Sequence, residues 1–73
     1  MEADRRVEIF GKDTCPYTQA ARDHYRSLGV AVEYRNVKKD PASLAAMLDL
    51  TRGRREVPVI VEAGKVTIGF GGT

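Results

Sequence analysis

The sequence predicts one small α/β domain over residues 1–73, in which two helices pack on a mixed four-stranded sheet. Two observations lead to this fold class. Short stretches rich in valine, isoleucine and tyrosine alternate along the chain with two segments of helical spacing, and each helical segment begins at an Xaa-Pro pair. The composition, 42% hydrophobic and 30% charged with no linker-like run, suits one compact core. The predicted order is strand, helix, strand, helix, strand, strand.

The first half of the chain predicts a strand, a loop and a helix. The apolar stretch from Val7 to Phe10 forms a short strand that ends at Gly11. Residues 12–15 form a loop into a helix that begins at Pro16, because proline is favoured at the first helical position. Gly29 ends this helix. The predicted inner face repeats every three or four residues and consists of Tyr17, Ala20, Ala21, His24, Tyr25 and Leu28.

The second half predicts a strand, a helix and a β-hairpin. The stretch from Val30 to Val37 alternates and is rich in β-branched residues. Asp40 is an N-cap residue followed by proline, and its helix continues to Gly53. Residues 57–61 form a third strand, which a tight turn joins to a fourth at residues 65–68. We expect the first two strands to be parallel and the last two antiparallel. The inner stripe of the second helix consists of Leu44, Met47, Leu48 and Thr51.

Charge and hydropathy argue against several classes of function. Twelve Lys and Arg against ten Asp and Glu give a net charge of +2, which is too small an excess to indicate nucleic acid binding. With no long apolar run and no signal-peptide core, we expect a cytoplasmic protein without a membrane partner. Basic residues cluster at Lys38 and Lys39 and at Arg52, Arg54 and Arg55. Each cluster is either a solvated face or a site for small anionic groups such as carboxylates.

Cys15 is the single cysteine, so the chain cannot form an internal disulfide. It stands at the start of the first helix, where unpaired N–H groups and the helix dipole favour a thiolate, and Lys12 adds a nearby cation. Cysteines in such places have pKa values well below about 8.5, and the thiolate is the form that attacks disulfides. The alternative is a buried structural cysteine. It fits poorly, because Cys15 lies outside the apolar stripe.

Other cysteine chemistries fail on spacing. A phosphatase loop needs five residues between cysteine and arginine, but six separate Cys15 from Arg22. A cysteine hydrolase needs a nearby histidine, but His24 lies nine positions along the same helix, roughly 13 Å away at 1.5 Å per residue. One cysteine and one histidine cannot fill a tetrahedral site, so we predict no metal site within one chain.

The segment Lys12–Thr18 resembles the active-site segment of glutaredoxins, in which a lysine and two residues precede Cys-Pro-Tyr-Cys. Residues 53–58 are similar to the family segment that ends in Thr-Val-Pro, and the glycine-rich end of the chain looks like the family's Gly-Gly segment. The resemblance covers nearly the whole chain. It implies a thioredoxin-like fold with glutathione as the co-substrate.

The resemblance also implies a role for each matching residue. Cys15 would be the catalytic nucleophile, in a motif with Thr14, Pro16 and Thr18. The Val57 backbone would pair with the backbone of the glutathione cysteine, beside a cis proline at Pro58. The other contacts to glutathione would come from Lys12 at the glycine carboxylate, Arg54 or Arg55 beside it, Tyr17 in the groove wall, and Gly72 and Thr73 at the γ-glutamyl carboxylate. Pro58 as a plain strand opener and Tyr17 as core packing remain open alternatives.

Three features depart from the family pattern. Thr18 stands where dithiol members carry their second cysteine, which implies a monothiol route. Glu56 replaces the usual threonine and puts a carboxylate near the site for an acidic tripeptide. Typical members continue into a third helix that is missing here, so we expect a thinly covered sheet face and a monomer or weak homodimer. The Cys-x-x-Thr motif also resembles a glutaredoxin-like group whose relatives carry selenocysteine at the position of Cys15.

The resemblance implies a glutathione-linked thiol-disulfide oxidoreductase that acts on glutathionylated or disulfide-bonded proteins. The alternative is a dimeric carrier in which two copies hold a [2Fe-2S] cluster through Cys15 and glutathione. Cluster-binding members typically have Gly-Phe where this chain has Pro16 and Tyr17, and they have a longer loop before the cysteine, so we favour the enzyme. A redox-inactive adaptor that uses the same groove is the third hypothesis.

Overall fold

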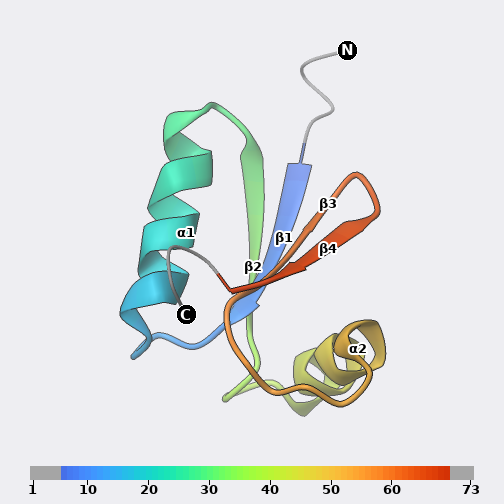
Figure 1. The fold of residues 1–73 in the computed structure, drawn as a ribbon. Helices are drawn as coiled ribbons and strands as arrows, with labels where there is room; N and C mark the ends of the chain where they lie inside the picture. Colours follow the sequence, from blue (N-terminus) through green and yellow to red (C-terminus); the bar gives the residue numbers. More distant parts are fainter. Residues whose placement is uncertain (1–5, 70–73) are drawn as a thin grey trace.

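The computed structural model describes residues 6–69, in which two helices lie on opposite faces of a four-stranded sheet (Figure 1). The helices are α1 (Pro16–Ser27) and α2 (Pro41–Thr51). The strands are β1 (Arg6–Gly11), β2 (Ala31–Asn36), β3 (Val59–Glu62) and β4 (Lys65–Ile68). The predicted fold class and the predicted order of elements are confirmed.

The sheet has the strand order β2-β1-β3-β4 and is mixed. β1 is parallel to β2 and antiparallel to β3, and β3 is antiparallel to β4. Both expected pairings are therefore confirmed. Phe10 near the end of β1 lies opposite Val59 at the start of β3. The loop after β1 and the segment before β3 therefore meet at one end of the two central strands.

Alternation along β1 divides the core into two clusters, one on each face of the sheet. Val7 and Ile9 pack with Ala21 of α1, whereas Phe10 packs with Met47 of α2. The α1 side is completed by Val30 and Ile60, and the α2 side by Val37 and Val59, all of them buried. The central strand β1 thus holds both helices to the sheet.

The inner face predicted for α1 is confirmed at Ala21 and Tyr25 and wrong at the other positions. Thr18 and Ala21 are buried and Tyr25 is half-buried, whereas Tyr17 is 41% exposed and Leu28 is 55% exposed. Ala20 and His24, which were also expected inside, are exposed. The prediction followed apolar side chains, but a small side chain was needed on the inner face because α1 passes very close to Gly11 of β1.

The inner stripe predicted for α2 is confirmed. Met47 and Thr51 are buried, and Leu44 and Leu48 are half-buried against the same cluster. The helix begins at the predicted N-cap residue Asp40, whose side chain accepts a hydrogen bond from the Ala42 N–H. It ends at Thr51, two residues before Gly53, and Arg52 follows in the left-handed conformation.

The strand predicted at residues 57–61 begins later, at Val59. Pro58 has no N–H to donate to a neighbouring strand, and its carbonyl accepts a hydrogen bond from Gly69 instead. Residues 57 and 58 thus form a linking segment in front of β3.

Within residues 6–69, β4 is the last element that the structure describes. The register places Thr67 opposite Ile60 and Lys65 opposite Glu62, so β4 presents two exposed polar side chains to the α1 side of the sheet. Polar side chains there need no helix to cover them. Among the described elements, neither helix has the length and apolar character required to cross a bilayer.

Candidate active site

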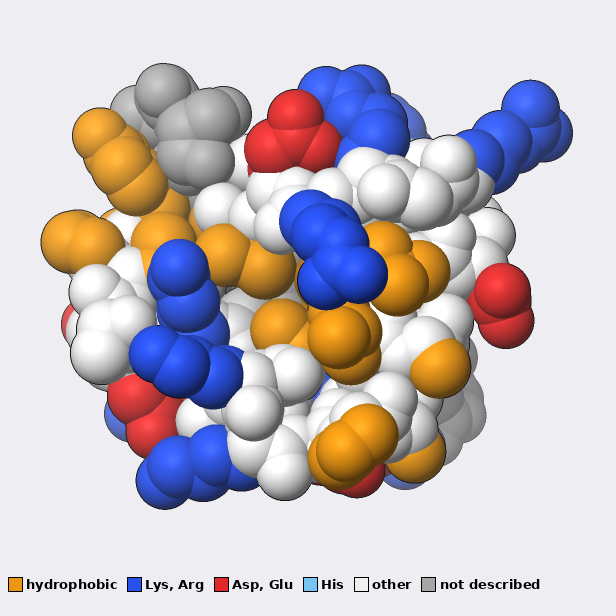
Figure 2. All heavy atoms as spheres, turned by 90° about the horizontal axis from the view of Figure 1, so that it is seen from below, with side chains coloured by type: hydrophobic (Ala, Val, Ile, Leu, Met, Phe, Trp, Pro, Cys, Tyr) orange, Lys and Arg blue, Asp and Glu red, His pale blue; other side chains and the backbone are white. Residues whose placement is uncertain are grey.

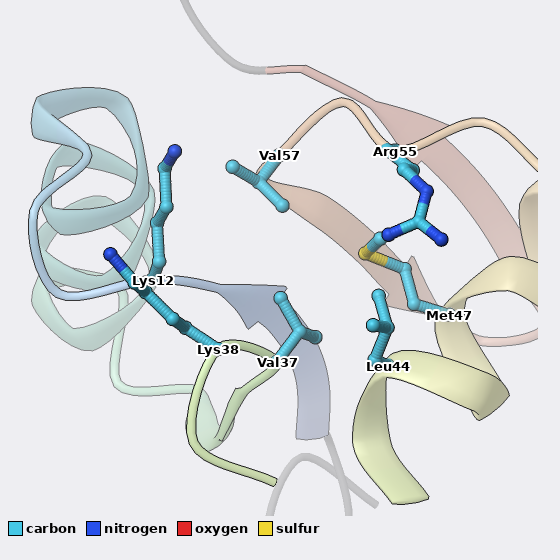
Figure 3. Close-up of a pocket in the computed structure, with 7 residues that line it drawn as sticks. All are labelled: Lys12, Val37, Lys38, Leu44, Met47, Arg55 and Val57. Carbon is cyan, nitrogen blue, oxygen red and sulfur yellow. The ribbon is translucent and has the colours of Figure 1, made fainter. Parts of the chain in front are cut away.

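Two loops flank a hollow of about 370 Å³ at the end of the sheet where β1 ends and β3 begins. One is the loop of residues 12–15, which leads from β1 into α1. The other is the segment from α2 to β3, which carries Arg55 and Val57. The lining consists of Lys12, Val37, Lys38, Leu44, Met47, Arg55 and Val57 (Figure 3).

Three cations surround the hollow. Lys12 and Lys38 rise from one side, Arg55 lies over Met47 on the other side, and Val57 lies between them (Figure 3). Among residues 6–69, no acidic side chain takes part in the lining. Figure 2 shows the same end of the molecule, where Lys and Arg side chains stand among hydrophobic patches. The structure therefore brings one residue from each predicted basic cluster to one concave surface that can hold a small anion.

Cys15 is a free, half-buried thiol and the N-cap residue of α1, as predicted. Its N–H donates to the Lys12 carbonyl at 3.2 Å, and its carbonyl accepts from the Thr18 N–H at 3.1 Å. These bonds fix the sulfur at the helix N-terminus. Burial of the sulfur opposes ionisation, but the Thr18 hydroxyl, the N–H groups of Thr18 and Tyr17 and the Lys12 ammonium outweigh it and lower the pKa of Cys15.

Thr18 fills the space between α1 and the end of β1. It is only 1% exposed. A Cβ atom on Gly11 would lie 2.4 Å from its Cγ2 and 2.5 Å from its Oγ1, so the close approach depends on glycine at that position. The Thr18 hydroxyl makes no hydrogen bond of ordinary geometry within the described part of the chain. A buried, unpartnered hydroxyl thus stands one helical turn from the cysteine.

Arg54 and Arg55 have different surroundings, although they are neighbours in sequence. Arg54 forms two hydrogen bonds with Glu56, from Nε to Oε1 and from Nη2 to Oε2, each at 3.1 Å. Arg55 lines the hollow. Of the two arginines, Arg55 is the one that faces this concave surface. The Glu56 carboxylate is paired with Arg54 and takes no part in the lining.

A polar cluster that the sequence did not reveal supports the loop before Cys15. The Tyr34 hydroxyl of β2 donates to the Asp13 carboxylate at 2.8 Å, and Lys39 lies 3.7 Å from the same carboxylate. The Arg22 guanidinium stands 4.0 Å from the centre of the Tyr34 ring. Burial and the hydrogen bond to Asp13 raise the pKa of Tyr34 to about 12. The one available signal was topological, since the ends of two parallel strands meet at one edge.

Several expected site residues lie elsewhere or cannot be placed. Thr14 borders a second hollow of about 220 Å³ with Asp13, Asn36, Lys38 and Lys39, and it does not line the first. Tyr17 does not line the first hollow either.

The Val57–Pro58 bond is cis, as the resemblance implied. Gly72 and Thr73 lie outside the described residues.

Residues 6–69 contain no group of three or more His, Cys, Asp and Glu side chains that could hold a metal ion. The sequence analysis also missed three residues of the first hollow, namely Val37, Leu44 and Met47. Leu44 and Met47 carried a signal, because they belong to the inner stripe of α2. That signal indicated burial and not the proximity of a hollow.

A family model described as glutaredoxin matches residues 7–67. The thioredoxin-like protein BC3987 has a similar structure, with a TM-score of 0.81 and 27% identity over 90% of this chain and 89% of that one. The glutaredoxin-like NrdH-redoxin from Escherichia coli has a TM-score of 0.74 and 26% identity over 90% and 84% of the two chains. A buckwheat glutaredoxin solved in complex with glutathione has a TM-score of 0.71 and 26% identity, over 89% of this chain and 61% of that one. No curated protein sequence matches significantly.

Proposed function

Because the chain belongs to the glutaredoxin family and thus has a thiol redox function, we propose that it is a glutathione-linked thiol-disulfide oxidoreductase with a monothiol mechanism. The observation that carries the proposal is the position of Cys15, which caps α1 directly after the loop that supplies Lys12 to a hollow ringed by three cations. Glutathione is an anionic tripeptide, so this hollow suits it in charge.

Catalysis runs through one mixed disulfide. The Cys15 thiolate attacks the glutathionyl sulfur of a glutathionylated protein, the old S–S bond breaks, and the protein thiolate leaves and takes a proton from water. A second glutathione thiolate then attacks the glutathione sulfur attached to Cys15. The products are glutathione disulfide and the free Cys15 thiolate, so the enzyme returns to its starting state.

Binding of glutathione rests on the side chains of the hollow. Lys12 and Arg55 stand on opposite sides of it and hold the glycine carboxylate, while Lys38 adds a third cation near Lys12. Val57 lies between these cations in the lining and supplies an apolar wall of the hollow. The buckwheat glutaredoxin was solved with glutathione bound, which supports this ligand for a chain of similar fold.

The monothiol route follows from the residue at position 18. The chain has one cysteine, and the place one turn after Cys15 is occupied by the buried Thr18. No internal disulfide can resolve the mixed disulfide, so a second external thiol must do so.

The test measures release of glutathione from a glutathionylated peptide in the presence of glutathione. We expect Cys15→Ser to reduce the rate to that without enzyme. Arg55→Ala should raise the KM for glutathione roughly three- to tenfold, because it removes one exposed charge-assisted contact. Arg54→Ala is the matched control, and its effect should be smaller since Arg54 is paired with Glu56.

A wild-type rate no faster than that of Cys15→Ser would contradict the proposal. So would a coloured dimer after anaerobic incubation with iron, sulfide and glutathione together with no transferase activity, because that result would indicate the cluster carrier. Equal effects of the two arginine variants would remove the hollow from the binding site but leave the chemistry at Cys15.

A further inference from the structure

Both helices begin with the same four-residue arrangement. Cys15-Pro-Tyr-Thr18 opens α1 and Asp40-Pro-Ala-Ser43 opens α2. In each, the N-cap residue is extended, with φ and ψ of −93° and 115° at Cys15 and −120° and 102° at Asp40, and proline follows. In each, the third helical residue carries a hydroxyl that is almost fully buried, with Thr18 1% and Ser43 2% exposed. The α2 terminus is therefore an internal reference for the α1 terminus.

At α2 the buried hydroxyl pairs with the N-cap anion. The Ser43 hydroxyl donates to Oδ2 of Asp40 at 2.7 Å, and the Ala42 N–H donates to Oδ1 at 3.2 Å. The Ser43 hydroxyl is the main cause of the lowered pKa of Asp40, followed by the N–H groups of Ala42 and Ser43, which outweigh the opposing effect of burial. Third-position hydroxyl and N-cap carboxylate thus form one permanent charge-assisted unit.

At α1 the same hydroxyl lacks such a partner. Thr18 Oγ1 is buried and makes no hydrogen bond of ordinary geometry in the described chain. The side chain packs so close to Gly11 that a Cβ atom on that residue would lie 2.5 Å from Thr18 Oγ1. A buried polar group without a partner is unfavourable, and the N-cap group that can gain a negative charge is the Cys15 sulfur.

We propose that the Thr18 hydroxyl donates a hydrogen bond to the Cys15 thiolate, and that Thr18 is therefore a catalytic residue that is satisfied only when Cys15 is ionised. The thiol and the mixed disulfide both present an uncharged sulfur, which is a poor acceptor. Thr18 consequently favours the thiolate when Cys15 attacks, and again when Cys15 is expelled by the second thiol. This second role rests on the proposed function, whereas the first is a property of the free protein.

Other ionisable groups near the loop do not replace this role. Lys12 and Asp13 come from the loop itself, Arg22 from α1 and Arg55 from the segment before β3. Tyr34 of β2 remains neutral while Cys15 titrates, because burial and the hydrogen bond to Asp13 raise its pKa to about 12. Lys12 lowers the pKa of Cys15 from a distance, and it is the smallest of the contributing groups.

The experiment measures the alkylation rate of Cys15 by iodoacetamide as a function of pH. Because Cys15 is the only cysteine, the rate reports its thiolate alone. We expect Thr18→Val, which keeps the shape and removes the hydroxyl, to raise the pKa of Cys15 by roughly one unit. Thr18→Ser should keep a value close to that of the wild type. The matched control Thr67→Val makes the same change at an exposed position of β4 and should leave the profile unchanged.

A second readout follows the mixed disulfide. Glutathione should release glutathionylated Cys15 roughly threefold more slowly in Thr18→Val than in Thr18→Ser, because a leaving thiol of higher pKa leaves more slowly. If the wild type has transferase activity but Thr18→Val leaves the alkylation profile unchanged, the role of Thr18 is overturned and the proposed function stands. If Thr18→Val shifts the alkylation profile as expected but the wild type has no transferase activity, the proposed function is overturned and the role of Thr18 stands.

Two results would overturn the inference directly. One is an alkylation profile of Thr18→Val that coincides with that of the wild type. The other is an equal rise in the pKa for Thr18→Val and Thr18→Ser, because packing and not the hydroxyl would then be responsible. If the valine variant does not fold, the methyl NMR signal of Thr18 in the wild type decides: it should titrate with the midpoint of Cys15, and a signal that does not titrate rejects the hydrogen bond.

Discussion

The N-termini of α1 and α2 have the same backbone arrangement but differ in the group that they hold. Asp40 is charged at neutral pH and accepts from a backbone N–H and from the Ser43 hydroxyl. Cys15 stands in the same place with a group that is charged only after it loses its proton, and as a thiol it makes no capping hydrogen bond. The same donors therefore stabilise a helix at α2 and make a nucleophile at α1.

The two helices also differ in how they pack on the sheet. α2 buries Ser43, Met47 and Thr51 and places two leucines against the core, whereas α1 fully buries only Thr18 and Ala21. α1 therefore contributes fewer large apolar side chains to the core than α2 does. Thr18 packs α1 closely on β1 at Gly11, and its hydroxyl is one of the groups that lower the pKa of Cys15.

The largest expected effect comes from making the two termini alike. Cys15→Asp places a permanent carboxylate among the donors of α1, including the N–H groups of Tyr17 and Thr18. We expect complete loss of transferase activity together with a gain of about 1 kcal/mol in the free energy of unfolding, since a capping carboxylate replaces a thiol. Urea denaturation at pH 7 measures the gain. A less stable variant would show that the α1 donors are not arranged as those of α2 are.

The matched control for this gain is Cys15→Ala, which removes the thiol and supplies no acceptor. It should also be inactive, but it should not be stabilised. A gain shared by both variants would indicate that loss of the sulfur, and not the new carboxylate, is responsible.

The sequence predicted this comparison only in part. Both Xaa-Pro helix starts, the order of strands and helices along the chain, and the stripe of α2 were visible in spacing and in residue type. The buried face of α1 was not visible, because Thr18 is polar. Its burial depends on the contact with Gly11, which forms only when α1 packs on β1. The hollow was also hidden, since Lys38 and Arg55 become neighbours only when β2 and the segment before β3 reach the same edge.

A smaller effect is expected in the pH dependence of stability, where the two caps act in different ranges. The folded-state pKa of Asp40 lies below its usual value of 3.8, so its contribution is present above that value and is lost as the pH falls through the lower folded-state pKa. Asp40→Ala should therefore be less stable than the wild type at neutral pH, and the difference should shrink in acid.

Cys15 should contribute to the free energy of unfolding at alkaline pH. Its folded-state pKa lies below the usual value of 9.0, so its contribution is complete above 9.0 and is lost as the pH falls through the lower folded-state pKa. Urea denaturation should thus show that the free energy of unfolding of the wild type exceeds that of Cys15→Ser by an amount that grows as the pH rises toward 9.0. A difference that stays constant with pH would mean that folding does not favour the Cys15 thiolate.

The smallest effect is expected from the cation beside the α1 terminus. Lys12 is exposed and contributes least of the groups that lower the pKa of Cys15, so Lys12→Ala should raise that pKa by only a few tenths of a unit. Salt separates this effect from that of Thr18. In about 1 M salt the Debye length is near 3 Å, so the alkylation profiles of Lys12→Ala and the wild type should converge, whereas the shift in Thr18→Val should persist because its hydroxyl is buried. A Lys12 effect that withstands salt, or a Thr18 effect that disappears in it, would reverse the ranking of the two residues and make the Cys15 thiolate a product of the surface charge and not of the capping geometry that α1 shares with α2.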